Sequence, residues 1–527
     1  MATSWSLAPL FEQRAREHPD RPLAVVGERA FSYGHVHTQA AALAAALAEL
    51  GLGKDDLIAV NLPNGVEWIV ALVAAAKLGA VVVPISPQLS SLDLRYQLRH
   101  AEASAVITIE RWAGVDYLQR FEDLLGDLPD LQYIVTVGDE DLWYDDRIFQ
   151  FEDLLSSGVG RSYPKPVVYD DAADLAVLYT SGTMGKPKGV VLSHQAVVEN
   201  AVRSAEAVEL SPDDRVFPSV PLFAIFGFSV MVGTIVAGST LVLRPASDAA
   251  GALATIEARR ATVLHAVPTL YHLLMREESF DQSRVGSVRA GVIAGSSVAE
   301  DLVRRVRRWC DVLVAYGLTE TGGTVTMTRF TDSEERRLQS VGRALPGIEV
   351  MAVDVVTGEL HGPEAVGEIA VRGSNTMRGY LRMPAETAKV HTPEGFFLTG
   401  DLGIIDEDGY VRVIGRRQET ITRGGQQLYP RELEERLRAH PAVDDVCVIG
   451  VPHDVLGEQV CACIVPVEGA VITGSEIKRF ALETMTAYKV PDLVRFFDVF
   501  PMTGSGKVRR RELARAIALD HTVSHTG

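Results

Sequence analysis

The sequence predicts an α/β fold in which a large N-terminal domain of helix-covered, mostly parallel β-sheets, with a small β unit, precedes a small α+β domain. Three observations support this. Short apolar segments alternate with helical segments over most of the chain, glycine-punctuated β-like segments follow from residue 348, and helical and strand segments mix after residue 416. Strands that alternate with helices are typical of buried parallel sheets. A chain of 527 residues also exceeds the roughly 150 residues of one average domain.

The first elements of the large domain have clear boundaries. Residues 38–50 (TQAAALAAALAEL) are strong helix formers, and Gly51 and Gly53 mark their end. An apolar strand is expected at 57–62, and a helix at 66–78 leads to a strand at 79–83. Further strands are expected at 104–108, 133–137, 175–179, 239–243, 263–266, 290–294 and 312–315.

The small domain is expected to be a compact α+β module. A helix is predicted at 430–440 and another at 475–483, with strands over VDDVCVIGVP, QVCACIVPV and VRFFDVF. We place the large domain at residues 1–417 and the small domain at 418–527, joined by a short hinge near residues 416–420.

Composition restricts the class of protein. The chain is 47% hydrophobic and 23% charged, as in ordinary globular proteins. Its net charge of −18 argues against nucleic acid as a partner. Four cysteines exclude a disulfide scaffold and favour a reducing compartment, so a cytoplasmic protein is expected. Cys447 and His453 could belong to a metal cluster, but buried cysteines in strands are the better interpretation.

One segment resembles a membrane span. Residues 217–243 carry no charged side chain and are long enough to cross a bilayer. Because Pro218 and Pro221 interrupt the segment, we expect a buried helix–strand pair instead. The first twenty residues lack the charged and apolar regions of a signal peptide.

The segment with the clearest chemistry is LYTSGTMGKPKG at residues 178–189. Glycines and small hydroxyl residues offer closely spaced N–H and O–H donors, which suit a phosphate chain, and Lys186 and Lys188 add charge. The pattern differs from that of a Walker A loop. Composition alone leaves open a polar strand-to-helix loop without ligand.

Five motifs together resemble those of the adenylate-forming superfamily, which includes acyl-CoA synthetases and stand-alone adenylation enzymes. They are TSGTMGKPKG, YGLTET at 316–321, TGDLG at 399–403, GRRQETITRGG at 415–425 and PMTGSGKVRRREL at 501–513. They occur in the family's order, and the similarity covers nearly the whole chain. The resemblance implies that the small domain is mobile.

The resemblance also implies a role for each matching residue. Lys507, Glu320 and Thr180 are expected to be catalytic, Glu320 by holding Mg²⁺. Tyr316 would stack on adenine, Thr319 would bond the α-phosphate, Asp401 the ribose, and Arg416 would reach the nucleotide. Gly317 and the loop residues Thr180, Ser181, Gly182, Thr183, Gly185 and Lys188 complete the expected ATP site. Glu419 is the expected hinge residue, and the expected thiol-acceptor loop is Arg423, Gly424 and Gly425.

The implied reaction has two steps. A carboxylic acid and ATP form an acyl adenylate and pyrophosphate, and the acyl group then passes to a thiol, with coenzyme A the expected acceptor. Alternatives are loading of a separate carrier protein, transfer to an amine, or a catalytically inactive nucleotide-binding relative. Both a monomer and a homodimer remain open.

Four departures from the family pattern concern the substrates and the hinge. Met184 replaces a hydroxyl residue, and Glu419 stands where Asp or Lys is usual. Ala224 offers no counter-charge for an amino acid's ammonium group, and Ser296 and Ser297 add hydroxyls to the pocket. The expected pocket predicts a medium-sized aliphatic or aromatic acid, with or without a hydroxyl or amino group. It is equally open that the two serines only bond the backbone. The expected pocket residues are Phe223, Ala224, Phe226, Gly227, Phe228, Gly295, Ser296, Ser297, Gly322 and Gly323.

Overall fold

The computed structural model describes residues 4–139, 145–165, 169–180, 186–245, 248–453, 455–502, 508–510 and 512–517. It divides into two compact units, each built from two separate stretches of chain. The first unit comprises Met1–Glu349 and Val371–Phe397, and the second comprises Val350–Ala370 and Leu398–Gly527. The predicted α/β class is confirmed. The predicted domain boundary after residue 417 stays a prediction.

The first unit contains an eight-stranded sheet that is parallel at its centre. In spatial order its strands are β21 (Gly379–Tyr380), β11 (Lys188–Ser193), β10 (Asp174–Thr180), β4 (Val81–Pro84), β3 (Leu57–Asn61), β5 (Ala105–Ile109), β8 (Tyr133–Val137) and β9 (Ile148–Gln150). Strand β11 runs antiparallel to β10, and β21 runs antiparallel to β11. A small hairpin, β6 (Arg111–Trp112) and β7 (Val115–Asp116), lies outside this sheet.

A nine-stranded sheet forms the second half of this unit. In spatial order its strands are β18 (Arg343–Ala344), β17 (Gly323–Met327), β16 (Asp311–Leu318), β15 (Ala290–Ile293), β14 (Val263–Ala266), β12 (Arg215–Pro218), β13 (Thr240–Leu243), β1 (Pro22–Val26) and β2 (Arg29–Ser32). The run from β16 to β1 is parallel. The strands predicted from apolar segments are confirmed in both sheets.

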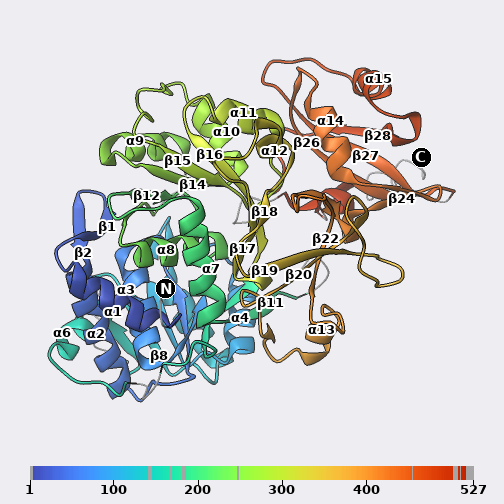
Figure 1. Ribbon diagram of the computed structural model, residues 1–527. Helices are drawn as coiled ribbons and strands as arrows, with labels where there is room; N and C mark the ends of the chain where they lie inside the picture. The colour runs from blue at the N-terminus through green and yellow to red at the C-terminus, as the bar shows by residue number, and fades with distance from the viewer. Residues whose placement is uncertain are drawn as a thin grey trace. The chain divides into compact units, whose positions relative to one another are not determined.

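Five long helices contribute buried side chains to one hydrophobic core, which also includes strands of both sheets (Figure 1). They are α1 (Leu7–Glu17), α2 (Tyr33–Glu49), α3 (Val66–Leu78), α7 (His194–Ala207) and α8 (Ile225–Ala237). Helices α3 and α8 meet through Trp68 and Phe228, whose ring centroids are 5.7 Å apart. Both helices end at a glycine with positive φ, Gly79 and Gly238, as is common at helix C-termini.

Two predictions for this core can be compared with the structure. Residues 217–243 form the end of β12, helix α8 and strand β13, which confirms the predicted helix–strand pair. Within the described part of the chain, no helix combines the length and apolar character needed to cross a membrane. Helix α2 begins five residues before the predicted start, because the Ser32 side chain accepts a hydrogen bond from the His35 N–H at 3.1 Å.

The remaining helices of the first unit connect strands or lie near their ends. They are α4 (Ser91–Ala101), α5 (Tyr117–Leu124), η1 (Leu125–Asp127), α6 (Phe151–Gly158), α9 (Ala249–Arg259), α10 (Pro268–Arg276), α11 (Glu300–Val306), η2 (Thr319–Thr321), α12 (Glu334–Gln339) and α13 (Pro384–Ala388).

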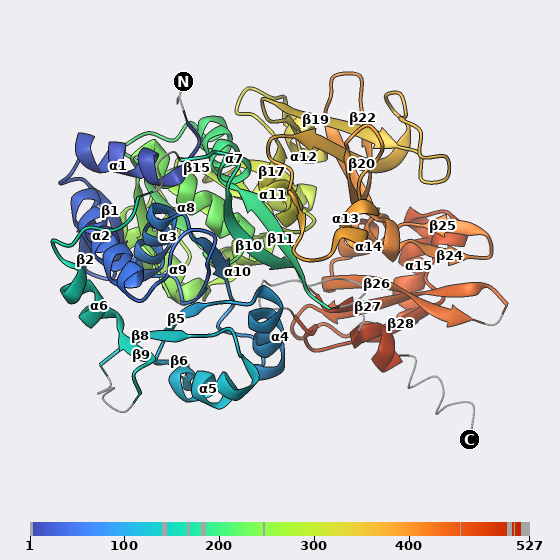
Figure 2. The same ribbon diagram turned by 90° about the horizontal axis from the view of Figure 1, so that it is seen from below.

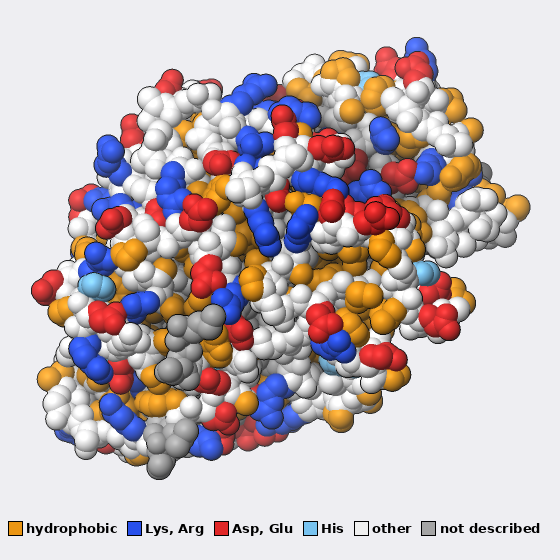
Figure 3. All heavy atoms as spheres, viewed as in Figure 1, with side chains coloured by type: hydrophobic (Ala, Val, Ile, Leu, Met, Phe, Trp, Pro, Cys, Tyr) orange, Lys and Arg blue, Asp and Glu red, His pale blue; other side chains and the backbone are white. Residues whose placement is uncertain are grey.

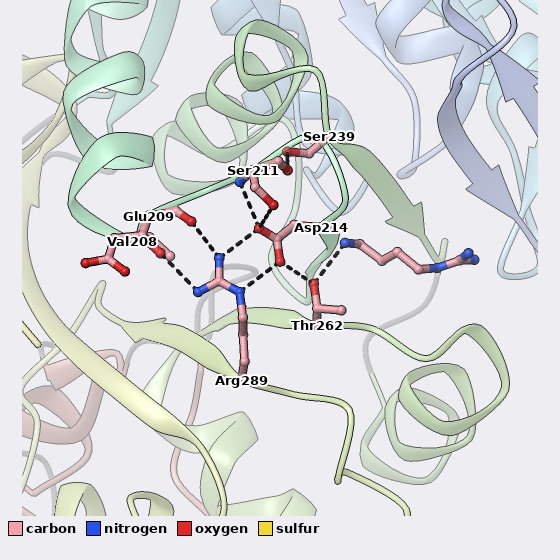
Figure 4. A network of polar contacts seen from close by, with 8 residues as sticks. Val208, Glu209, Ser211, Asp214, Ser239, Thr262 and Arg289 are labelled. Atoms are coloured by element: carbon pink, nitrogen blue, oxygen red, sulfur yellow. Dashed lines mark hydrogen bonds and ion pairs between the residues drawn. The ribbon is translucent and has the colours of Figure 1, made fainter.

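A polar network joins the starting ends of β12, β14 and β15 (Figure 4). Asp214, Thr262 and Arg289 each come directly before one of these strands. The Asp214 carboxylate accepts hydrogen bonds from Arg289 Nε at 2.9 Å, Arg289 Nη2 at 2.7 Å and Thr262 Oγ1 at 2.7 Å. It also accepts one from the Ser211 N–H at 2.8 Å, while Arg289 Nη2 donates to the Glu209 carbonyl at 2.7 Å. The network therefore fixes this edge of the sheet, opposite the carboxyl ends of its parallel strands.

Two further sheets lie mostly in the second unit. One comprises β19 (Ile348–Val353), β20 (Val366–Gly373), β22 (Phe397–Ile405) and β23 (Val411–Arg416), and one end of each of its first three strands belongs to the first unit. The other comprises β25 (Gln426–Leu428), β24 (Ile421–Arg423), β27 (Gly457–Pro466) and β26 (Val443–His453), with β28 (Leu493–Phe496) on β27. Helices α14 (Pro430–Arg438) and α15 (Gly474–Thr484) confirm the two predicted helices, and η3 (Arg417–Glu419) and η4 (Ala487–Lys489) complete the unit.

The cysteines of the second unit are part of its hydrophobic packing. Cys447, Cys461 and Cys463 are all buried in one apolar cluster, and Cys447 lies opposite Cys463 in the β26–β27 pair. Over the residues that the structure describes, no group of three or more His, Cys, Asp or Glu side chains could hold a metal ion. The burial of these cysteines in two paired strands agrees with the expectation of buried cysteines in strands.

Charges of both signs share the visible surface. On the face shown in Figure 3, acidic and basic side chains lie among one another rather than gathering by sign.

Candidate functional site

The predicted phosphate loop connects strands β10 and β11, which lie side by side (Figure 2). Thr180, at the end of β10, is paired with Lys188, at the start of β11. The strand predicted before the loop is confirmed, but a strand rather than a helix follows it. Ser181, Gly182, Thr183, Met184 and Gly185 lie outside the described residues.

Helix α4 contacts the residues at both ends of this loop. The Tyr96 hydroxyl donates a hydrogen bond to the Pro187 carbonyl at 3.0 Å, and the Lys186 ammonium lies 5.4 Å from the centroid of the Tyr96 ring. Tyr179 on β10 donates to the Gln97 carbonyl at 3.1 Å. The stem of the loop is thus attached to a helix from a distant part of the chain.

Glu320 and Lys188 lie on two sides of one tyrosine. The Tyr380 hydroxyl is 3.1 Å from Glu320 Oε1, and Lys188 Nζ lies 4.6 Å from the centroid of the Tyr380 ring. Lys188 also forms an ion pair of 3.2 Å with Glu386 on α13. Burial, and then the charge of Glu320, raise the pKa of Tyr380 well above its usual value, so its hydroxyl keeps the proton and donates.

The segment around Glu320 follows β16 as a tight turn. Strand β16 ends with Tyr316, Gly317 and Leu318, which all pair with β17. Thr319, Glu320 and Thr321 follow as the short helix η2. A Cβ on Gly317 would lie 1.9 Å from the Gly323 carbonyl oxygen, so this position excludes a side chain. Gly322 has φ of 62°, and Gly323 has φ of 123°, conformations that favour glycine.

The predicted acid-pocket residues collect at one edge of the nine-stranded sheet. Phe223, Ala224, Phe226 and Gly227 follow the end of β12, whereas Gly295, Ser296 and Ser297 follow β15, and Gly322 and Gly323 follow β16. Since these strands are parallel, their carboxyl ends share an edge, where α/β sheets usually bind ligands. Phe223 and Phe226 are partly buried, while Ser296 and Ser297 are exposed. Phe228 is fully buried and packs on Trp68 instead.

His265, at the same edge, was missed by the sequence reasoning. It lies on β14, is 4% exposed, and its ring centroid is 6.2 Å from that of Phe226 in an edge-to-face arrangement. Its Nδ1 is buried, with no hydrogen-bond partner among the described residues. Burial lowers the pKa of His265 to about 3, so the imidazole is neutral at ordinary pH.

The second unit pairs two predicted nucleotide ligands. Asp401 on β22 lies opposite Arg416 on β23, and Arg416 Nε is 3.0 Å from Asp401 Oδ1. The Asp401 side chain is 7% exposed, whereas that of Arg416 is 40% exposed. The structure thus brings this carboxylate and this guanidinium together, while their roles toward the nucleotide stay predictions.

The predicted acceptor loop is a two-residue turn between β24 and β25. Gly424 and Gly425 have φ of 55° and 83°, which gives these glycines a role in turn geometry besides any close approach of a ligand. Arg423 is held by Asp492 through contacts of 2.8 and 2.6 Å. The expected hinge residue Glu419 pairs with Arg510 Nε at 3.4 Å. Lys507 lies outside the described residues.

Tyr380 and Glu386 were also missed from the sequence. They occur in RGYLRMPAET at 378–387, and β21 pairs Tyr380 with Val190, two residues after Lys188. This pairing joins segments nearly two hundred positions apart. The glycine–tyrosine pair before a short helix gives no local sign of this pairing.

Comparisons with known proteins agree with the motifs. A family model described as AMP-binding enzyme matches residues 11–381, and one described as AMP-binding enzyme C-terminal domain matches residues 432–507. A putative acyl-CoA synthetase, YngI of Bacillus subtilis (strain 168), is 32% identical, over 96% of each chain. The mitochondrial medium-chain acyl-CoA ligase ACSF2 of Mus musculus is 29% identical, over 95% of this chain and 85% of the relative.

Solved structures also match over the whole length. The crystal structure of ATP-bound MatB from Rhodopseudomonas palustris superimposes with a TM-score of 0.88 at 28% identity, covering 98% of this chain and 99% of that one. The o-succinylbenzoate CoA synthetase MenE of Bacillus subtilis, in complex with its acyl-adenylate intermediate, gives 0.82 at 26% identity, covering 96% and 97%. With the family model matching well over half of its length, the chain belongs to the AMP-binding enzymes, the adenylate-forming superfamily that its motifs resemble.

Proposed function

We propose that this chain is an AMP-forming acid–thiol ligase that joins a medium-sized, mainly apolar carboxylic acid to coenzyme A. In the first step a carboxylate oxygen attacks the α-phosphorus of ATP, and pyrophosphate leaves. In the second step the thiol sulfur attacks the acyl carbonyl carbon, the thiol proton is released, and AMP leaves. The observation that carries the proposal is the gathering of Lys188 and Glu320 around Tyr380 at the base of the phosphate loop.

Mg²⁺ fits the donor groups at this place. Protein sites for Mg²⁺ in nucleotide-dependent enzymes usually supply one or two carboxylates and leave the other positions to phosphate and water. The Glu320 carboxylate is such a donor, and the Tyr380 hydroxyl and the Met377 N–H bond its side chain and its carbonyl at 3.1 and 2.8 Å. When bound, the cation would neutralise charge on the phosphates.

The protein's own groups supply the rest of the first step. Two anions must meet, so cationic groups that neutralise and orient them carry much of the catalysis. We assign Lys188 to the β- and γ-phosphates, Thr319 to the α-phosphate and Asp401 to the ribose. Lys507 is assigned to the attacking carboxylate and the α-phosphate, by resemblance to the family.

The acid class follows from the pocket edge. Phe223 and Phe226 present partly buried aromatic faces, which suit an aliphatic or aromatic chain. Ala224 offers no charge to pair with an ammonium group. Ser296, Ser297 and the buried His265 Nδ1 supply polar atoms, which suit an acid with a hydroxyl or another small polar group. The name of the mouse relative, a medium-chain acyl-CoA ligase, supports this chain length.

A pyrophosphate-exchange screen over a panel of carboxylic acids, with and without coenzyme A, tests the proposal. We expect exchange with medium-sized apolar acids and formation of a thioester and AMP when coenzyme A is added. Exchange without thioester would redirect the second step to a carrier protein or an amine. Absence of exchange with every acid would contradict the enzymatic assignment.

We also propose a cytoplasmic location, and rotation of a small domain that begins after residue 417, with Glu419 as the hinge. The four cysteines, Cys310, Cys447, Cys461 and Cys463, are buried thiols without disulfides, as suits a reducing compartment.

A further inference from the structure

Tyr380 is fixed in place by its main chain. Strand β21 pairs with β11 so that Tyr380 lies opposite Val190, and the Tyr380 N–H donates to Thr387 Oγ1 at 2.9 Å. Gly379, just before it, has φ of 150° and lies so close to Thr387 that an added Cβ would be 2.9 Å from the Thr387 side chain. The Tyr380 ring is therefore held at one position beside the phosphate-loop stem, and it is only 8% exposed.

The tyrosine hydroxyl serves Glu320. It donates to Glu320 Oε1 at 3.1 Å, while the Met377 N–H donates to the Glu320 carbonyl at 2.8 Å. Two bonds from residues 377–380 thus orient Glu320 from both its side chain and its main chain. Hydrogen bonds to an ionised carboxylate are stronger than neutral ones and fix its direction.

The tyrosine ring serves Lys188. The Lys188 ammonium lies 4.6 Å from the ring centroid, within the range in which a cation is attracted to an aromatic face. Glu386 holds the same ammonium at 3.2 Å and is itself held by Lys389 at 2.6 Å. Hydrogen bonds from Lys389 and Lys188 lower the pKa of Glu386, so it remains charged.

We propose that Tyr380 is a positioning residue for adenylation, which sets the spacing between the metal-binding carboxylate of Glu320, through its hydroxyl, and the phosphate-binding ammonium of Lys188, through its ring face. The proposal rests on the proposed function for the roles of Glu320 and Lys188. The contributions of the Tyr380 hydroxyl and of the Tyr380 ring face can be separated by substitution. Phenylalanine keeps the ring face and loses the hydroxyl, whereas leucine loses both.

The test compares Tyr380→Phe, Tyr380→Leu and the control Tyr33→Phe. Tyr33 is another fully buried tyrosine, and its hydroxyl donates to the Ser239 carbonyl at 2.9 Å. Binding of Mn²⁺ with a non-hydrolysable ATP analogue is followed by electron paramagnetic resonance. Pyrophosphate exchange gives KM for ATP at saturating Mg²⁺.

Tyr380→Phe is expected to raise the Mn²⁺ concentration for half-saturation by about tenfold, as losing the partner of a metal ligand usually does, with KM for ATP near that of the wild type. Tyr380→Leu is expected to raise both, and Tyr33→Phe neither. Combined with Glu320→Gln, Tyr380→Phe should add no further loss of metal binding, because both changes remove one interaction.

Unchanged Mn²⁺ binding in Tyr380→Phe would overturn the proposal. Losses of Mn²⁺ binding that add fully in the double variant would also overturn it.

If Tyr380→Phe does not fold, a second variant, Thr387→Val, takes its place. This change removes the acceptor of the Tyr380 N–H and is expected to weaken Mn²⁺ binding by a smaller factor. Unchanged Mn²⁺ binding in Thr387→Val would likewise contradict the proposal. The wild type could bind Mn²⁺ and the ATP analogue while no acid supports pyrophosphate exchange. In that case the proposed function fails, but the Mn²⁺-binding data still test the role of Tyr380.

Discussion

Arg289→Met is expected to destabilise the first unit more than Asp214→Asn, although both changes break the same ion pair. The Asp214 side chain is 4% exposed, whereas that of Arg289 is 39% exposed. Removing the guanidinium leaves a carboxylate buried without its counter-charge. Removing the carboxylate charge leaves a guanidinium that still reaches water and still donates to the Glu209 carbonyl.

The structure gives the size of the difference. A buried charge without its partner costs about 3–5 kcal/mol, and we expect this loss for Arg289→Met. Thr262 donates to Asp214 Oδ1 and the Ser211 N–H to Asp214 Oδ2, so Asp214→Asn keeps an acceptor for only one of them. It also loses charge-assisted bonds, which are worth about 1.5–3 kcal/mol. The gap between the two variants should therefore be at most roughly 2 kcal/mol.

The gap should also depend on pH. Burial alone would raise the pKa of Asp214, but the hydrogen bonds from Arg289 and Thr262 lower it below its usual value. In the wild type the stability from this carboxylate is present above its unfolded pKa and is lost as pH falls. In Arg289→Met burial acts without the guanidinium and raises the pKa, so protonation relieves the penalty and the gap narrows toward pH 5.

Urea unfolding followed by tryptophan fluorescence measures this, because the five tryptophans all lie in the sequence before residue 350, within the first unit. Rates of adenylation at low urea serve as the control. They should stay at the wild-type level, since the network lies at the starting ends of the strands. Equal losses in the two variants, or a gap that does not change with pH, would refute the reasoning.

Three further predictions concern single residues. Lys507→Ala should lower adenylation by on the order of 10²–10³-fold and leave thiolysis of a supplied acyl adenylate intact; equal losses in both half-reactions would contradict its role. Burial lowers the pKa of His194 to about 4, so its stabilising effect is complete above its unfolded pKa of 6.5 and is lost as pH falls toward 4. The loss amounts to about 3 kcal/mol, and His194→Gln should flatten this dependence in urea unfolding at pH 4–7. His265→Leu should lower kcat/KM for hydroxylated acids and spare their unsubstituted analogues, which steady-state kinetics with matched acid pairs will show.

Much of the fold could be predicted because its signals are local. Strands such as 133–137 and 263–266 are apolar runs between helical segments. Because both faces of these strands are buried, the apolar run alone predicts the strand, and its neighbours in the sheet need not be known. The helix–strand pair within residues 217–243 followed from two prolines and the absence of charge. The start of helix α2 was predicted five residues after its true position. The true start depends on one capping hydrogen bond, from the His35 N–H to Ser32, which composition does not reveal.

The candidate site was predictable only where one segment carries a whole motif. The family motifs gave Thr180, Lys188, Glu320 and Asp401 as candidates one by one, and their roles stay predictions. What holds these residues was not predictable, because Tyr380 reaches Glu320 through a strand pairing between distant segments. His265 was hidden for a related reason, since a histidine within an apolar strand gives no sign of whether its ring has a partner.

The division of each unit into two stretches has a consequence for biosynthesis. Strand β11 forms part of the stem of the phosphate loop, and among the described residues its outer edge pairs with β21, at Gly379–Tyr380. Residues 350–370, which belong to the other unit, emerge from the ribosome before β21 does. During that interval β11 is an unpaired sheet edge, the kind of surface that templates aggregation. A nascent chain paused there, or a fragment ending before residue 379, would leave this edge uncovered and open to pairing with another chain.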